Sequence, residues 1–249
     1  MGLEDVGPAI AACSRSTVDC ARDRWRSLDD WQIGVAAIVF AGVIVGLIFA
    51  IWPQLDLKIS ALFYDPAHHD WFWARMPTVL ALRSFNDFVT RVMVATAVIV
   101  LIFAAAGGRT FAFLPPRVAV FLLAALVLGP GLIANGIFKA HWSRPRPGEV
   151  TAFGGALDFV PWWSPFGHCT SNCSFVSGEV ASASCLLAVA LVLPERYRRR
   201  AILGVIVYGL AIALMRVAMG GHFLSDALFA GIFTALAIWL LYRAMFPAR

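Results

Sequence analysis

The sequence predicts an all-α integral membrane protein, a bundle of six transmembrane helices with both termini in the cytoplasm. Three observations support this fold class. The 249-residue chain is 60% hydrophobic and 14% charged, and its mean hydropathy of +0.78 is far too high for a soluble domain of this length. Six long apolar runs are separated by polar segments, and basic residues gather in alternate segments.

Each apolar run is long enough, or nearly so, to cross about 30 Å of hydrocarbon. The predicted spans are residues 33–53, 88–106, 118–138, 179–193, 201–219 and 225–245. The third contains Gly129, Pro130 and Gly131, which should bend the helix without breaking it inside a bundle. The fourth is the shortest, and the alternative for a single run is a buried helix of a soluble core.

The chain divides into a polar cytoplasmic segment, residues 1–32, and one membrane domain, residues 33–249. A signal peptide would begin with basic residues followed at once by an apolar run. Here about thirty mostly polar residues precede the first run. We therefore expect the first span to be retained as an anchor.

The orientation follows from the basic residues, because short loops rich in Lys and Arg stay in the cytoplasm. Twelve of the twenty Lys and Arg precede the first span, lie between the second and third, crowd the turn PERYRRR (194–200) or end the chain. The long segments 54–87 and 139–178 should then face the periplasm from a bacterial inner membrane. The net charge of +5 reflects this topology, so it predicts no nucleic-acid partner.

The five cysteines separate by compartment. Cys169 and Cys173 lie in an outer loop as CTSNC and can pair in an oxidising periplasm. The alternatives are free thiols or a zinc site with His168, but two thiols and one imidazole in one short loop form a weak zinc pattern. We predict no metal site. The other cysteines are expected in the cytoplasm, where thiols stay reduced, or within a span: Cys13, Cys20 and Cys185.

Three stretches concentrate polar residues that a membrane chain tolerates poorly. They are KAHWSRPRP (139–147), SFVSGE (174–179) and RVAMGGHFLSD (216–226). Each lies at an outward-facing end of a predicted span, so all three can converge at one interface. Ionisable groups at such depth are costly unless they are paired, which makes them functional candidates.

Several of these residues are suited to binding a phosphate group. Lys139 offers a point charge, and Arg146 and Arg216 offer forked donors for the phosphate oxygens and for the extra charge of the transition state. Ser177 and Gly178 precede the fourth span, so their backbone N–H groups and the Ser177 hydroxyl can point at an anion. Together they predict an oxyanion cradle.

His222 is the natural nucleophile beside this cradle, because an imidazole nitrogen can attack phosphorus in line. Asp226 follows four residues later, and we expect it to lie on the same face and hold the other ring nitrogen of His222. Gly220 and Gly221 allow the chain to turn tightly before the histidine.

These residues resemble the type 2 phosphatidic acid phosphatases, a family of membrane lipid phosphate phosphatases. The first motif of that family, Lys, six residues and Arg-Pro, is matched by Lys139, Arg146 and Pro147. The third motif, Arg, five residues, His, three residues and Asp, is matched by Arg216, His222 and Asp226. The resemblance implies a phosphohistidine mechanism with these residues, Ser177 and Gly178 in the roles above, and it implies no metal or cofactor.

The sequence departs from the family pattern at two positions. Met215 stands where the family usually has Ser, which removes one hydroxyl near the phosphate. The middle motif, usually Pro-Ser-Gly-His, is Val-Ser-Gly-Glu, so Glu179 occupies the place of the histidine that protonates the leaving oxygen. The role of that histidine does not carry over unchanged.

Four hypotheses account for Glu179. In the first, it is a carboxylate before substrate binds and becomes the proton donor when a phosphate dianion arrives, because like charge favours protonation. In the second, Glu179 pairs with a spare cation such as Arg144, and His141 or His168 is the acid. In the third, the leaving group is a weak base and needs no acid. In the fourth, the protein is catalytically inactive.

The sequence therefore predicts an inner-membrane phosphatase that acts at the periplasmic face on a phosphorylated lipid. Candidate substrates are lipid A, undecaprenyl diphosphate, phosphatidylglycerol phosphate and phosphatidic acid. The aromatic outer stretches DWFW (70–73) and VPWWSPF (160–166) and the altered acid favour a large headgroup such as lipid A. The alternatives are a lipid-to-lipid phosphotransferase and a non-enzymatic lipid-binding or transport protein. The bilayer is the expected partner, and no obligate protein partner is inferred.

Overall fold

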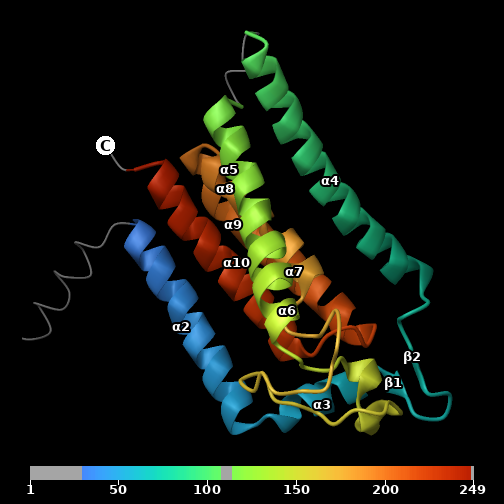
Figure 1. Cartoon of the computed structure of the whole chain (residues 1–249). Coiled ribbons are helices and arrows are strands. Elements are labelled where there is room, and N and C mark those ends of the chain that lie inside the picture. Colours follow the sequence, from blue (N-terminus) through green and yellow to red (C-terminus); the bar gives the residue numbers. More distant parts are fainter. Residues whose placement is uncertain (1–29, 108–113, 248–249) are drawn as a thin grey trace, which may run out of the picture.

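The computed structural model describes residues 30–107 and 114–247 (Figure 1). Most of the predicted cytoplasmic segment, with Cys13 and Cys20, lies outside these residues. The helices are α2 (Asp30–Ile51), α3 (Gln54–Ala61), α4 (Pro77–Ala105), α5 (Pro116–Leu126), α6 (Lys139–His141), α7 (Gly178–Ser184), α8 (Leu186–Val192), α9 (Glu195–Ala218) and α10 (Leu224–Met245). A π-helix, η1 (Val127–Phe138), joins α5 to α6, and two 3-10 turns, η2 (Pro147–Glu149) and η3 (Thr151–Phe153), follow. Strands β1 (Tyr64–Asp65) and β2 (Asp70–Trp71) form a small antiparallel hairpin.

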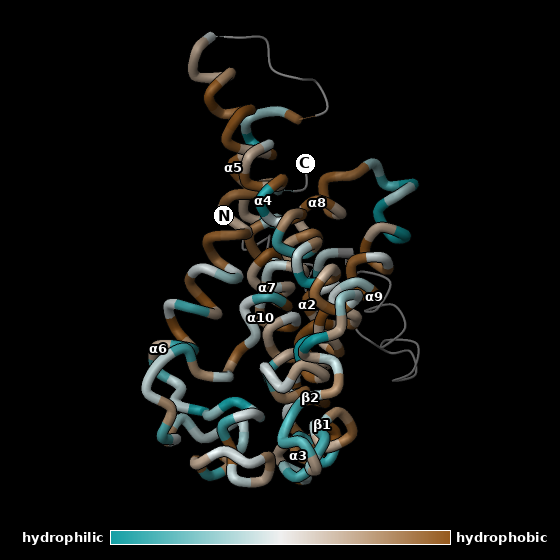
Figure 2. Tube along the Cα trace, turned by 90° about the vertical axis from the view of Figure 1, so that its right-hand side faces the viewer, coloured by the Kyte–Doolittle hydropathy of each residue, from teal (hydrophilic) through white to brown (hydrophobic). Residues whose placement is uncertain are grey.

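The described residues form a mostly helical protein with the surface of a membrane protein, as predicted. Five of its helical segments are long and apolar enough to cross a membrane: Trp31–Ile51, Pro77–Ala105, Pro116–His141, Glu195–Ala218 and Leu224–Met245. Gly178–Val192 is apolar but shorter. Large apolar side chains such as Phe40, Phe103 and Leu203 are more than half exposed, which suits contact with lipid rather than water. The loops at one end of the bundle are more polar than the helices (Figure 2).

The second long helix begins earlier than predicted. The span was expected at residues 88–106, whereas α4 begins at Pro77, a residue that suits the first turn of a helix. The extra turns contain Arg83 and Asn86, whose polarity argued against a span. The helix tolerates them because both side chains find hydrogen-bond partners on Glu179.

The third span continues through its Gly-Pro-Gly sequence. From Val127 to Phe138 it follows π-helical hydrogen bonding, so the chain runs on without a break. Gly129 is required here because a Cβ atom at this position would lie 2.7 Å from Cγ2 of Thr234 on α10. The glycine therefore allows η1 and α10 to approach closely.

Helix α10 lies at the centre of the bundle and packs against α2, α7, α9 and η1 (Figure 1). The predicted fourth span is two short helices, α7 and α8, which meet at the buried Cys185. Helix α7 is also packed between α9, α10 and η1. Its N-terminus is thereby fixed at the end of the bundle where the polar loops gather.

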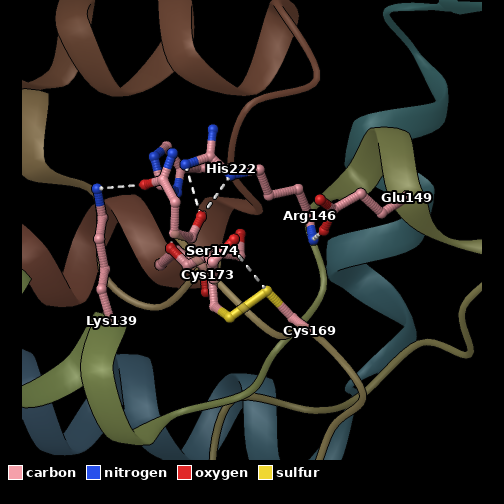
Figure 3. Close-up of a disulfide and its surroundings, with 10 residues drawn as sticks. Lys139, Arg146, Glu149, Cys169, Cys173, Ser174 and His222 are labelled. Atoms are coloured by element: carbon pink, nitrogen blue, oxygen red, sulfur yellow. Dashed lines mark hydrogen bonds between the residues drawn. A yellow bond between two sulfur atoms is a disulfide. The ribbon is translucent and has the colours of Figure 1, made fainter.

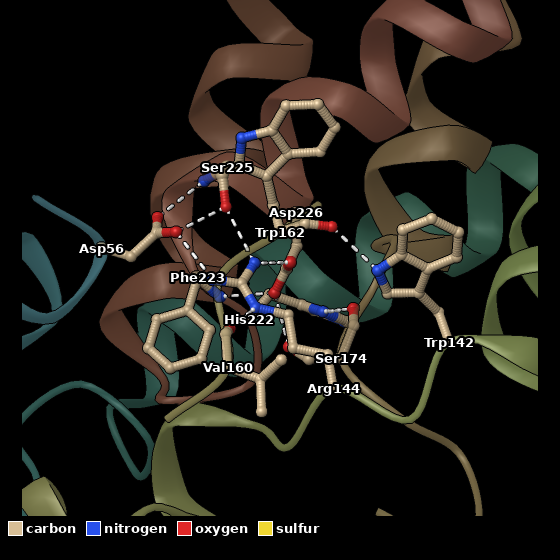
Figure 4. A network of polar contacts seen from close by, with 10 residues as sticks. All are labelled: Asp56, Trp142, Arg144, Val160, Trp162, Ser174, His222, Phe223, Ser225 and Asp226. Carbon is tan, nitrogen blue, oxygen red and sulfur yellow. Dashed lines mark hydrogen bonds and ion pairs between the residues drawn. The ribbon is translucent and has the colours of Figure 1, made fainter. Parts of the chain in front are cut away.

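A buried ion-pair network fastens these loops to α10 (Figure 4). Arg144 is fully buried, and its Nη2 donates to Oδ2 of Asp56 on α3 at 2.7 Å. Its Nη1 donates to Oγ of Ser225 at 2.8 Å and pairs with Asp226, and its Nε donates to the carbonyl oxygen of Val160 at 2.8 Å. Buried charges are tolerated only when partners compensate them, so this network fixes three separate segments in one arrangement.

We predict that Asp56→Asn destabilises the protein. The variant keeps the shape of the side chain but removes a charge that compensates Arg144, which should cost about 3 kcal/mol. For a chain of this size, the melting temperature in detergent should fall by about 6–12 °C. Asp158→Asn, at an exposed position, is the matched control. Equal melting temperatures for the two variants would contradict the prediction.

Candidate active site

The three polar stretches of the sequence meet at the polar end of the bundle. Lys139 begins α6, Arg146 precedes η2, and Arg216 lies in the last turn of α9. His222 is only 2% exposed and lies in the turn between α9 and α10. Complete burial, together with the positive charges of Arg216, Arg146 and Lys139, holds the pKa of His222 well below its usual value of 6.5. The imidazole is therefore neutral at physiological pH, as a nucleophile must be.

The turn that carries His222 depends on two glycines. Gly220 has a φ of +68°, and a Cβ atom there would lie 2.2 Å from the indole ring of Trp71. At Gly221 a Cβ atom would lie 2.3 Å from Nη2 of Arg216. The glycines thus allow the backbone to pass between Trp71 and the guanidinium group of Arg216.

The tautomer of His222 follows from its hydrogen bond. Nδ1 lies 2.7 Å from the carbonyl oxygen of Ser174. A carbonyl oxygen can only accept, so Nδ1 carries the hydrogen and Nε2 carries the lone pair. Nε2 is therefore the ring nitrogen whose lone pair could act as a nucleophile.

The expectation that Asp226 binds the other ring nitrogen of His222 is wrong. Oδ2 of Asp226 accepts hydrogen bonds from the backbone nitrogen of Phe223 (2.9 Å) and from Oγ of Ser174 (2.5 Å). Its Oδ1 pairs with Arg144. Asp226 is the third residue of α10, where a carboxylate reaches back to cap the first turn. Asp226 is therefore linked to His222 through Ser174, whose hydroxyl donates to Asp226 and whose carbonyl oxygen lies against Nδ1 of His222.

The disulfide loop lies near Lys139, Arg146 and His222 (Figure 3). Cys169 and Cys173 form a disulfide with a Cα–Cα distance of 5.7 Å. Within this loop, the backbone oxygen of Asn172 accepts from Nε (3.0 Å) and Nη2 (2.8 Å) of Arg146. Its Oδ1 accepts from Nζ of Lys139 at 3.3 Å. Asn172 thus brings oxygen atoms to the same donors that a phosphate would use.

Ser177 and Gly178 form the start of α7, as the sequence indicated. Ser177 is the N-cap, and its Oγ accepts from the backbone nitrogen of Val180 at 3.4 Å. Its own backbone nitrogen donates to the carbonyl oxygen of Asp226, so that N–H group does not point at an anion. A Cβ atom on Gly178 would lie 3.5 Å from Nζ of Lys139, so Gly178 lies directly beside this cation.

Glu179 pairs with two arginines, neither of which is Arg144. Its Oε1 lies 3.1 Å from Nε of Arg83 and 3.2 Å from Nη1 of Arg216. The pairing with Arg144 is wrong because that guanidinium group is fully engaged between Asp56 and Asp226. Oε2 of Glu179 is buried and has no hydrogen-bond partner among the described residues.

The two histidines considered as alternative acids are both exposed. Nδ1 of His141 lies 2.9 Å from the carbonyl oxygen of Ile137, one helical turn back. His168 neighbours the disulfide and makes no hydrogen bond or ion pair within the described part of the chain. The described contacts give no support to either imidazole as the acid.

Sequence reasoning missed several residues that shape the site: Asp56, Arg83, Asn86, Asn172 and Ser174. A signal existed for three of them. Asp56 is a lone acid in the mostly apolar stretch QLDLKISALF, and Arg83 and Asn86 interrupt an otherwise apolar helix. Ionisable and strongly polar groups in such settings require partners. Asn172 and Ser174 carry no such signal, because uncharged polar residues such as Asn and Ser are common in loops.

Comparison with known proteins agrees with this geometry. The sequence model of the PAP2 superfamily matches residues 118–249. The lipid A 4'-phosphatase of Francisella tularensis subsp. novicida (strain U112) is 33% identical over 220 residues, which cover 87% of this chain and 96% of that protein. The lipid A 4'-phosphatase of Rhizobium etli is 47% identical over 104 residues, 42% of this chain and 40% of its own length. The one of Rhizobium leguminosarum is 43% identical over 104 residues, 42% of this chain and 45% of its own length.

No solved structure matches the chain. The superfamily match covers more than half of the sequence and includes both spaced motifs. The long alignment with the Francisella protein extends over the N-terminal helices as well. The chain therefore belongs to the PAP2 superfamily and is a membrane-spanning phosphatase.

Proposed function

We infer that this phosphatase removes the 4'-phosphate of lipid A at the periplasmic face of the bacterial inner membrane. The observation that carries the proposal is the likeness to a lipid A 4'-phosphatase over nearly the whole of both chains. The site agrees, because cations and a neutral imidazole suit a phosphate monoester. A membrane-embedded bundle leaves the acyl chains of the substrate in the bilayer.

The proposed topology has six spans and places both termini in the cytoplasm. The short apolar segment Gly178–Val192 is the fourth crossing, since its N-terminus lies at the polar end of the bundle. The basic turn between α8 and α9 then lies on the cytoplasmic side, as the distribution of Lys and Arg favours. The active site and the Cys169–Cys173 disulfide face the periplasm, which is an oxidising compartment.

Binding of the phosphate exchanges one set of oxygen atoms for another. Lys139 and Arg146 release the oxygens of Asn172, and Arg216 releases Glu179, so that all three donate to the phosphate. The exchange keeps each cation paired, which limits the cost of desolvation. The same three charges stabilise the extra negative charge of the transition state.

The reaction then proceeds through a phosphohistidine. Nε2 of His222 forms a bond to phosphorus while the bond from phosphorus to the sugar oxygen breaks, and a proton from Glu179 passes to that oxygen. Glu179 has taken this proton from the substrate monoanion on its buried Oε2. A water molecule next attacks phosphorus and gives one proton to Glu179 while the bond from Nε2 to phosphorus breaks. Glu179 passes this proton to the departing phosphate, which leaves as the monoanion, and both Glu179 and His222 return to their starting forms.

Asp226 is a positioning residue in this scheme. Its carboxylate holds Oγ of Ser174 and the first turn of α10. The carbonyl oxygen of Ser174 in turn fixes the Nδ1–H of His222. The lone pair of Nε2 is thereby directed at the phosphate, and the positive charge that develops on the ring faces a carbonyl dipole.

We predict that His222→Ala abolishes the activity. Purified protein should release inorganic phosphate from lipid A and leave a product that keeps its 1-phosphate, as mass spectrometry would show. The variant should lose about 10³-fold or more of kcat because the nucleophile is missing. His68→Ala removes an exposed imidazole on the hairpin and serves as the control.

Three results would contradict the proposed function. Retained phosphate release by His222→Ala would exclude the nucleophile. Transfer of labelled phosphate to a second lipid instead of water would indicate a phosphotransferase. A preference for phosphatidic acid, phosphatidylglycerol phosphate or undecaprenyl diphosphate over lipid A would replace the proposed substrate.

We also predict the acidic limb of the pH profile. His222 must be neutral to attack, and burial with neighbouring cations lowers its pKa well below 6.5. The acidic limb of kcat/KM, which reports the free enzyme, should therefore lie below pH 6.5. Activity measured between about pH 4 and 8 checks this. A midpoint above 6.5 that Glu179→Gln leaves unchanged would show that His222 is not held in its neutral form.

A further inference from the structure

Helix α4 carries none of the motif residues, yet it holds Glu179 by two separate groups. Nε of Arg83 donates to Oε1 of Glu179 at 3.1 Å. One turn later, Nδ2 of the buried Asn86 donates to the backbone oxygen of Glu179 at 3.2 Å, and Tyr208 on α9 fixes Asn86 at 3.0 Å. Residues three apart lie on the same face of a helix, so α4 presents both groups to one partner.

The second cation beside Glu179 is Arg216. Arg216 is a predicted phosphate ligand, and its side chain is only 7% exposed. Its Nη1 is 3.2 Å from Oε1 of Glu179, while its Nε is buried without a partner among the residues that the structure describes. When phosphate takes the donors of Arg216, Glu179 loses this partner at the moment when a new negative charge arrives.

Glu179 is a carboxylate before it takes the proton of the substrate and again after it has given that proton to the leaving oxygen, and a carboxylate without a cation in this position would be unfavourable. It would lie partly buried, beside the phosphate, and repulsion would turn the side chain away from the site. Arg83 prevents this because its pairing with Oε1 does not depend on any motif residue. The pairing also leaves Oε2, the buried oxygen without a partner, free to carry the proton.

We propose that Arg83 is a positioning residue that retains Glu179 in the site as the proton donor after the phosphate has taken Arg216. The proposal rests on the proposed function, in which Glu179 protonates the leaving oxygen. It also explains how a glutamate serves at the position where the family usually has histidine. An imidazole without its extra proton is neutral and needs no cation beside it. A carboxylate is negative and needs a cation when its neighbours change partners.

The leaving group provides a specific test of this role. The sugar oxygen of lipid A is strongly basic as it leaves and needs a proton, whereas p-nitrophenolate is a weak base and does not. A defect in the proton donor therefore lowers the rate with lipid A far more than the rate with p-nitrophenyl phosphate. Loss of folding or of phosphate binding lowers both rates alike.

The experiment compares kcat and KM of Arg83→Gln, Arg83→Lys, Glu179→Gln and the double variant Arg83→Gln/Glu179→Gln on both substrates. Arg91→Gln is the matched control, because Arg91 is an exposed arginine two turns along the same helix. With lipid A, Arg83→Gln should lower kcat by about tenfold or more with little change in KM. With p-nitrophenyl phosphate the loss should be under about threefold, and Arg83→Lys should recover part of the loss.

The double variant measures the coupling between the two residues. If Arg83 acts through Glu179, adding Arg83→Gln to Glu179→Gln should lower kcat by less than about twofold more. Equal losses on both substrates, additive effects, or kcat equal to that of Arg91→Gln would each overturn the proposal. Failure of the proposed function differs from these outcomes, because wild type and His222→Ala would then be equally inactive on lipid A.

Discussion

The buried guanidinium group of Arg144 holds three separate segments of the protein in one arrangement. It lies fully buried between Asp56 of α3, Asp226 of α10 and the carbonyl oxygen of Val160. A buried arginine is stable only if its donors and its charge are compensated, so these three segments must keep one arrangement. The rings of Phe223 and Phe159 cover the guanidinium group at 4.5 and 5.5 Å and exclude water from it. The loops at the polar end of the bundle are thereby fixed relative to the helices.

The same network extends to His222, the proposed nucleophile. Asp226 binds Arg144 with one oxygen and holds Ser174 and the start of α10 with the other. Ser174 then presents its carbonyl oxygen to His222. The histidine is therefore oriented by a chain of contacts that begins outside the family motifs. This arrangement links stability to catalysis, because the residues that anchor the loops also direct the ring.

The proposed phosphate site must also keep three positive charges close together. The cluster gathers Lys139, Arg146 and Arg216, which would repel one another if they were left unpaired. Oxygen atoms of the protein itself pair with each cation. Asn172 supplies them for Lys139 and Arg146, and Glu179 supplies one for Arg216. A phosphate group would offer its three terminal oxygens to the same donors. The site is thus preorganised for a tetrahedral anion without having to collect its cations on binding.

Parts of this site were readable from the sequence, and other parts were not. Spacing placed Lys139, Arg146, Arg216 and His222 together, because each lies at the end of an apolar run. Spacing did not show that Asp226 binds Ser174, since an acid four residues from a histidine can face either the ring or its own helix cap. The partner of Glu179 was also missed. Arg83 lies 96 residues away on a helix whose polar turns had been assigned to a loop.

Residue order alone is enough to identify this chain as a helical membrane protein whose polar motifs lie at the ends of its apolar runs. Hydrophobic length and residue spacing are local properties, so a single chain displays them directly. The partner of each charged side chain, in contrast, follows only from the folded structure. Arg144, Arg83 and Asn172 take their roles from contacts between distant segments, where burial makes each unpaired group costly and so selects one set of partners.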